Sequence, residues 1–186
     1  MTHDPPRTDV GSAAVAEPLL AENLARAQDA LRRAEEVNRR LIEAMPGGIV
    51  EVGIDGAIRR ANAEAQRILG FSFDELTRRY VVDFQPETMC EDGSPCRVED
   101  YPVSRCLATS EAQPPTTIGV RRPGGDITWS IFTAIPTFDP DSGRLTSALV
   151  TFIDITARKH AEEALNASVR EREIFLAHKM ESCLLY

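Results

Sequence analysis

Two apolar segments in the second half of the chain, and the helix-forming sequence directly after them, constrain the fold most. Ile127–Phe138 and residues 145–155 are rich in β-branched and aromatic residues, which favour strands. Residues 139–143 between them, Asp-Pro-Asp-Ser-Gly, are turn formers, so the two segments predict a long antiparallel hairpin. The second strand continues without a break into a charged segment from Ala157 that favours a helix. A change in the sheet can therefore tilt or rotate this helix.

A second long helix is predicted over residues 17–45, and its pattern is that of a coiled coil. Apolar or small residues and one Asn recur at alternating steps of four and three, the spacing of a heptad seam: Leu20, Leu24, Ala27, Leu31, Ala34, Asn38 and Leu41. We predict a parallel homodimer through the flanking helices, in which Asn38 fixes the register. The alternative is a single amphipathic helix packed on its own domain. Residues 1–16 are expected to be disordered.

The residues between these two regions predict short elements with clear boundaries. The expected elements are strands at 49–52 and 57–61, helices at 63–69, 73–79 and 103–111, and a strand at 116–122 ahead of the hairpin. Asn62 is a suitable N-cap for the first helix, and Ser72 with Glu75 has the spacing of a capping box for the second. The predicted class is α+β, with a five-stranded antiparallel sheet, a short irregular helical insert and flanking coiled-coil-type helices.

Composition bounds the function. The 186 residues allow one core of ordinary size plus extensions, and the net charge of −8 argues against a nucleic-acid partner. No apolar run approaches the roughly 20 residues that span a bilayer, and no signal peptide is recognisable, so we expect no membrane contact and a cytoplasmic location. The cysteines are too few and too irregularly spaced for a disulfide framework and are expected to be free thiols: Cys90, Cys96, Cys106 and Cys183.

Short motifs along residues 41–165 occur in the order and spacing of a known sensor domain. They are residues 43–49, Asp55-Gly56, Arg60-Ala61-Asn62, residues 68–71, Glu75-Leu76, residues 121–125, Trp129, Pro136 and Asp154-Ile155-Thr156. In these motifs the chain resembles the PAS family, of the kind found upstream of bacterial histidine kinases. The resemblance implies a PAS domain over residues 46–156 and a signalling helix over 157–186.

The resemblance also implies a pocket between the sheet and the helical insert. Its candidate lining residues are Phe84, Met89, Val103, Cys106, Leu107, Trp129, Phe132, Val150 and Phe152. The pocket either holds a small ligand that the sequence does not identify or is a filled core. The strands are apolar on both faces, so the sequence does not say which face lines the pocket. It does predict that the second face is covered too, by the N-terminal helix or by a partner chain.

The junction between the last strand and the C-terminal helix is the predicted route of the signal. Asp154 and Thr156 can cap the helix, and Ile155 can anchor in the core. Arg158 lies four residues after Asp154, close enough for a local ion pair. We therefore assign the transfer of the signal to these four residues.

Two cofactors of PAS relatives are not expected. Haem would need a histidine in the insert, whereas His3, His160 and His178 all lie outside residues 41–156. Photosensors that form a cysteinyl–flavin adduct carry an Asn-Cys-Arg-Phe segment, whereas the comparable residues 86–92 read Pro-Glu-Thr-Met-Cys-Glu-Asp. No cofactor and no metal are predicted.

The predicted function is a sensory and dimerisation module of a two-component type of system, with a kinase or other output protein as partner. We predict that the chain is not an enzyme, because it has no phosphate-binding loop and no nucleophile elbow. The first alternative is the sensor part of a cytosolic histidine kinase with its catalytic domains beyond residue 186. Residues 175–182 resemble the segment that leads into the dimerisation helix of such kinases. The second is a metal or redox sensor that uses Cys90, Cys96 and Cys106.

Overall fold

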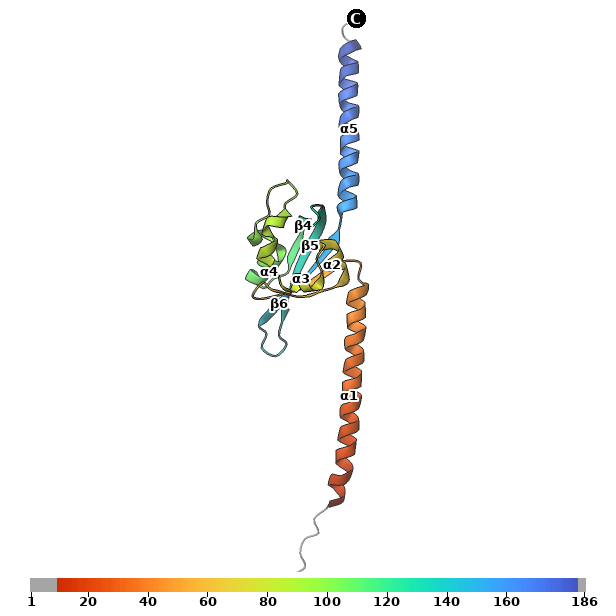
Figure 1. Cartoon of the computed structure of the whole chain (residues 1–186), viewed down its shortest axis with the longest axis vertical. Helices are drawn as coiled ribbons and strands as arrows, with labels where there is room; N and C mark the ends of the chain where they lie inside the picture. The colour runs from red at the N-terminus through yellow and green to blue at the C-terminus, as the bar shows by residue number, and fades with distance from the viewer. Residues whose placement is uncertain (1–9, 184–186) are drawn as a thin grey trace, which may run out of the picture. The chain divides into compact units, whose positions relative to one another are not determined.

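The first of two compact units is a single helix. The computed structural model describes residues 10–183, with side chains from 20 to 173, and the chain divides into two units between Ala44 and Met45 (Figure 1). Helix α1 (Val10–Ala44) makes up the first unit. It begins at Val10, seven residues before the predicted start at residue 17, and the predicted disorder of residues 1–9 falls outside the described part.

Ion pairs along α1 support its helical conformation. Glu22 and Arg26 are 2.6 Å apart, and Glu36 and Arg40 are 2.8 Å apart, each at the four-residue spacing that brings side chains together on a helix. Such pairs lie on the faces of α1 away from the predicted seam. The seam leucines themselves are exposed; Leu24, for example, keeps 60% of its accessible surface.

The second unit is an antiparallel sheet with a helical insert. Its elements are β1 (Gly48–Gly53), β2 (Ile58–Ala61), α2 (Ala63–Leu69), α3 (Phe73–Thr77), the 3-10 helix η1 (Val81–Glu87), β3 (Thr88–Met89), the 3-10 helix η2 (Val98–Asp100), α4 (Pro102–Thr109), β4 (Gln113–Arg121), β5 (Ile127–Phe138), β6 (Leu145–Asp154) and α5 (Thr156–Cys183). The sheet has six strands in the order β2-β1-β6-β5-β4-β3. Five strands were predicted. The sixth, β3, which pairs with β4, was missed because it is too short to show the alternation of apolar and polar residues that marks a strand.

The predicted hairpin of β5 and β6 forms the centre of the sheet. Phe132 pairs with Phe152 in its register, and their rings stack with centroids 4.8 Å apart. At the turn, the side chain of Asp139 accepts a hydrogen bond from the backbone N–H of Ser142 at 2.7 Å. This local hydrogen bond is why the Asp-Pro-Asp-Ser-Gly sequence was a sufficient turn signal.

Both predicted helix caps are confirmed, and Asn62 does more than cap. Its Oδ1 accepts hydrogen bonds from the backbone N–H groups of Ala65, in α2, and of Ile49, in β1, both at 2.9 Å. Its amide also donates to the Gly47 carbonyl at 3.0 Å, so one buried side chain joins α2 to β1. Ser72 and Glu75 form the reciprocal capping box at the start of α3.

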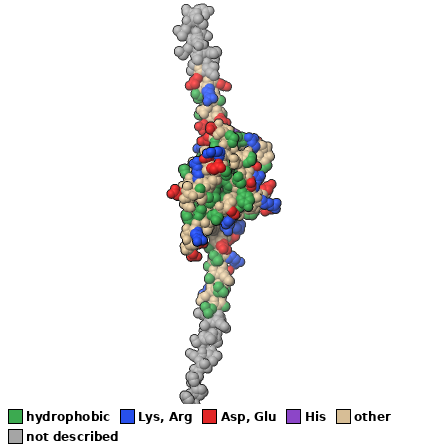
Figure 2. Space-filling model, turned by 90° about the vertical axis from the view of Figure 1, so that its left-hand side faces the viewer, with side chains coloured by type: hydrophobic (Ala, Val, Ile, Leu, Met, Phe, Trp, Pro, Cys, Tyr) green, Lys and Arg blue, Asp and Glu red, His purple; other side chains and the backbone are tan. Residues whose placement is uncertain are grey.

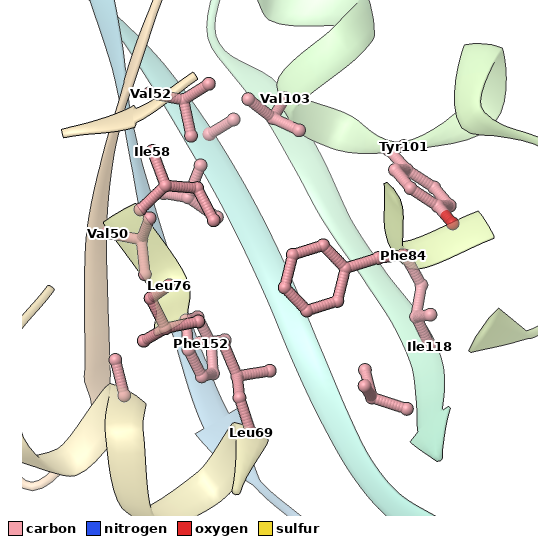
Figure 3. Packing of buried hydrophobic residues seen from close by; sticks show 14 of the residues in the cluster. Val50, Val52, Ile58, Leu69, Leu76, Phe84, Tyr101, Val103, Ile118 and Phe152 are labelled. Atoms are coloured by element: carbon pink, nitrogen blue, oxygen red, sulfur yellow. The ribbon is translucent and has the colours of Figure 1, made fainter. Parts of the chain in front are cut away.

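One hydrophobic core lies between the sheet and the helices of the insert. The buried side chains of Val52 and Phe152 from the sheet meet those of Ile68, Leu76 and Cys106 from α2, α3 and α4. Figure 3 shows side chains from the strands and from the insert pointing toward one another across this space. The helices therefore cover one face of the sheet.

The other face of the sheet carries apolar side chains as well. Ile135 of β5 and Ile153 of β6 are 48% and 60% exposed. A second cover over this face, by α1 or by a partner chain, stays a prediction.

Candidate functional site

The candidate site is a small apolar cavity inside the core. It has a volume of about 90 Å³. Its lining residues are Val50, Val52, Ile58, Leu69, Val81, Phe84, Thr88, Tyr101, Pro102, Val103, Ile118, Val120, Phe132, Val150 and Phe152, several of which Figure 3 labels. Ligand pockets for drug-sized molecules measure about 300–1,000 Å³, whereas a cavity of about 150 Å³ already admits benzene or xenon. In this conformation the cavity suits only a small apolar molecule.

The structure brings together five of the nine predicted lining residues. Phe84, Val103, Phe132, Val150 and Phe152 all border the cavity. They come from η1, α4, β5 and β6, so the cavity does lie between the sheet and the insert as predicted.

Two predicted lining residues lie on the wrong face of the sheet. Ile118 and Val120 of β4 border the cavity, so Gly119 between them faces the other way. A Cβ atom added to Gly119 would lie 2.9 Å from Met89 Cγ and 3.1 Å from Trp129 Cζ3. Met89 and Trp129 therefore lie beside each other on the face opposite the cavity.

Two further predicted residues pack in α4 without lining the cavity. The Cys106 side chain is fully buried in the core, and burial raises the pKa of its thiol. Leu107 is partly buried against the same core. Both belong to the packing that holds α4 on the sheet.

The cavity has one polar end, which the sequence did not reveal. The hydroxyl groups of Thr88 and Tyr101 hydrogen-bond to each other. Burial raises the pKa of Tyr101, and the charge of Glu87 acts in the same direction, although the Thr88 hydrogen bond opposes them. Because the two hydroxyls satisfy each other, the cavity offers a ligand mainly apolar contacts.

The junction between β6 and α5 is tied to the neighbouring strand. The backbone N–H of Trp129, in β5, donates to Thr156 Oγ1 at 2.9 Å, and the N–H of Ile155 donates to the Trp129 carbonyl at 2.8 Å. Asp154 Oδ1 accepts from the Thr156 N–H at 2.9 Å, and Ile155 is buried. Asp154 and Ile155 lie as predicted, as an acceptor at the start of the helix and as an anchor in the core, whereas the Thr156 hydroxyl bonds to β5. The role of these residues in signal transfer stays a prediction, and Trp129, predicted as a pocket residue, is a fourth participant in the junction.

The predicted partner of Asp154 is wrong. Arg158 is exposed, and the carboxylate of Asp154 lies instead 3.8 Å from the guanidinium of Arg67, in α2. The basic residue of the first turn of α5 that contacts the domain is Lys159. Its Nζ is 2.6 Å from a carboxylate oxygen of Glu91 and 5.3 Å from the centroid of the Trp129 ring. These contacts join residues far apart in the sequence, so no local pattern could indicate them.

The cysteines of the insert also depart from the prediction. Cys90 and Cys96 form a disulfide, so they are not free thiols, while Cys106 is a free, buried thiol. The three therefore do not converge on a common metal site. Among the side chains that the structure describes, no group of three or more from His, Cys, Asp or Glu is arranged to hold a metal ion. Cys183 lies outside the described side chains.

The surface of the domain mixes charges of both signs. Figure 2 shows acidic and basic side chains interleaved with hydrophobic ones on the face in view. Many charged side chains of the domain are paired, as in the contact of Arg79 with Glu87 at 3.1 Å. No helix in the described part of the chain is both long and apolar enough to cross a membrane.

Comparison with known proteins identifies the family. A family model described as the PAS fold matches residues 42–160, which is more than half of the chain. The chain therefore belongs to the PAS family, a family of sensory domains. A search of curated proteins found no match.

Solved structures show the same fold at low sequence identity. The PAS domain of an HTR-like protein from Haloarcula marismortui has a TM-score of 0.55 and 18% identity, over 70% of this chain and 99% of that one. An RNA-binding Light-Oxygen-Voltage receptor has a TM-score of 0.54 and 20% identity, over 91% of this chain and 41% of that one. The PAS domain of nitrogen regulation protein NR(II) from Vibrio parahaemolyticus has a TM-score of 0.50 and 14% identity, over 63% of this chain and 97% of that one.

Proposed function

We propose that this chain is a sensory and dimerisation module that passes a signal from the PAS core to helix α5. The observation that carries the proposal is the direct hydrogen bonding of the start of α5 to the strands that border the cavity. Phe152 and Val150 of β6 line the cavity, and the same strand leads through Asp154 to the first residue of α5, Thr156. A shift of β6 or β5 on ligand binding would change the hydrogen bonds that fix this helix.

A small apolar molecule is the ligand class that the cavity favours. The side chains around it are apolar except for the paired hydroxyls of Thr88 and Tyr101. A ligand with charges would lose its hydration without gaining partners there, which is unfavourable. We propose no metal, haem or flavin for this chain.

The role of the junction can be tested by removing one hydroxyl. Thr156→Val keeps the shape of the side chain but removes the oxygen that accepts from the Trp129 N–H. We expect faster amide exchange at Trp129, whose N–H loses its acceptor, and over residues 156–160, with unchanged exchange in residues 130–152. Thr151→Val is the matched control, because it removes a hydroxyl from β6 that bonds to Thr133 at 2.7 Å, away from the junction. Equal effects of both substitutions would contradict the proposal.

Dimerisation is proposed to occur through α1 as a parallel coiled coil. The seam leucines Leu20, Leu24, Leu31 and Leu41 are each 60–67% exposed, although they are regularly spaced along one stripe of the helix. An exposed row of leucines at heptad spacing is stabilised when a second helix covers it. A second copy of this chain supplies an identical row, which suits a symmetric partner.

Sedimentation can test the dimer with charge-matched variants. The wild type should sediment as a dimer at micromolar concentration, and Leu24→Glu with Leu31→Glu should give monomers, because charges in the seam lose their hydration. The double variant Ala25→Glu with Arg32→Gln changes the net charge by the same amount as the seam variant. Both of its positions lie off the seam, so this control should remain a dimer. A monomeric wild type, or a control variant that dissociates as readily, would refute the coiled coil.

We propose further that the chain has no catalytic activity of its own and acts on a kinase or another output protein. Incubation with labelled ATP should leave it unlabelled, and stable phosphorylation of any histidine would overturn this. The alternative, that the chain is the sensor part of a histidine kinase, is tested by joining it to the catalytic domains of such a kinase. The proposal of a signalling module holds in either case if the junction variants alter the output.

A further inference from the structure

We propose that the Cys90–Cys96 pair is a thiol–disulfide exchange site whose oxidation state is transmitted to the first turn of α5. The disulfide closes a loop in the insert, directly after strand β3. The second half of this inference rests on the proposed role of α5. The first half, the exchange chemistry, does not depend on it.

The loop between the two cysteines is compact and well hydrogen-bonded. The Cys90 N–H donates to the Ser94 carbonyl at 2.8 Å, and the Gly93 N–H donates to the Cys90 carbonyl at 3.0 Å. Asp92 Oδ1 accepts from the Ser94 hydroxyl at 2.6 Å. These bonds can persist in the dithiol form, so we expect reduction to loosen the loop without unfolding the domain.

Glu91, the residue after Cys90, connects the loop to α5. Its carboxylate lies 2.6 Å from Lys159 Nζ, and the Lys159 ammonium lies above the Trp129 ring. The Lys159 side chain is only 20% exposed, and these two contacts engage its ammonium group. When the disulfide fixes Cys90, it also fixes the backbone that carries Glu91. Reduction removes this covalent constraint, leaves only the loop hydrogen bonds to hold that backbone, and so weakens the contact with Lys159.

The two cysteine residues differ in exposure, which favours one order of the exchange. Cys96 is 3% exposed, whereas Cys90 is more exposed, so we infer attack at the Cys90 sulfur. A thiolate of a dithiol reductant bonds to this sulfur and breaks the Cys90–Cys96 bond, and the leaving Cys96 thiolate takes up a proton. The second thiol of the reductant then displaces Cys90. The protein gains two electrons and two protons, and the dithiol becomes a disulfide.

Mass spectrometry can test the exchange site. Alkylation in denaturant should label two of the four cysteines in the oxidised protein and all four after treatment with dithiothreitol. A graded glutathione redox buffer should convert one form reversibly into the other. Failure to form the Cys90–Cys96 bond under mild oxidation, or its formation only in unfolded protein, would overturn the proposal.

Amide exchange tests the transmission. We expect residues 157–160 to exchange about two- to fivefold faster in the reduced protein, the range that loss of an exposed ion pair allows. Glu91→Gln should abolish this difference while leaving the disulfide intact, and Cys90→Ser with Cys96→Ser should match the reduced state under all conditions. Identical exchange of these residues in both redox states would overturn the transmission. That outcome is distinct from failure of the proposed function, which the Thr156 and Thr151 variants test without any redox change.

Discussion

Replacing Asp154 with Ala should loosen the start of α5 while the sheet stays folded. The substitution removes the acceptor of the Thr156 N–H bond, measured at 2.9 Å. Loss of a side-chain cap costs about 1 kcal/mol, within a range of about 0.5–2 kcal/mol. Loss of the ion pair with Arg67 adds less, because its atoms are 3.8 Å apart and the Arg67 side chain is 59% exposed. An exposed pair of this kind contributes about 0–1 kcal/mol to stability.

Together these losses amount to about 1–2 kcal/mol, or a roughly five- to thirtyfold larger population of the opened junction. Hydrogen–deuterium exchange should show this increase over residues 156–160 and leave residues 127–152 protected. Asp154→Asn separates the two contributions, since it keeps an acceptor oxygen and removes the charge. We expect it to fall between the wild type and the Ala variant. Equal loss of protection in the sheet and the helix would mean that Asp154 serves the fold as a whole.

Two other substitutions test the core. Gly48→Ala should destabilise the domain by about 1–3 kcal/mol, because the added Cβ would overlap ring carbons of buried Phe152. Gly124→Ala, with open space around its Cβ, should have little effect in the same urea titration. Tyr101 should ionise above the ordinary tyrosine pKa of about 10, because burial raises its pKa, so the unfolding free energy should fall as the pH rises past that value. In Tyr101→Phe this loss of stability at alkaline pH should be smaller. If the rise in tyrosinate absorbance with pH is the same in the variant as in the wild type, the assignment of the raised pKa to Tyr101 is wrong.

The parts of the fold that the sequence predicts well depend on local chemistry. The Asn62 cap, the Ser72–Glu75 capping box and the Asp139 turn each join residues a few positions apart, so their geometry follows from spacing alone. The Asn62 bond to Ile49 is different, since it needs β1 to be already in place. The sequence therefore predicts the element boundaries better than the contacts between elements.

The parts of the site that the sequence misplaces depend on the tertiary structure. Strands β5 and β6 carry apolar residues on both faces, so alternation could not decide whether Trp129 or Phe132 faces the cavity. The Glu91–Lys159 contact joins the insert to α5, and nothing near either residue in the chain indicates it. Likewise, the Cys90–Cys96 bond depends on the turn that brings the two cysteines together, with Cα atoms 5.2 Å apart.

Xenon binding would test most directly whether the cavity communicates with α5. Xenon enters apolar cavities without needing polar partners. Under xenon pressure, the amide resonances of Val150 and Phe152 should shift, because their side chains line the cavity. If the junction transmits the change, the amides of Ile155 and Thr156 should shift at the same xenon pressures, while that of Gly124 in the β4–β5 turn stays unchanged. Shifts confined to the cavity-lining residues, with Ile155 and Thr156 unaffected, would contradict transmission from the core to the helix.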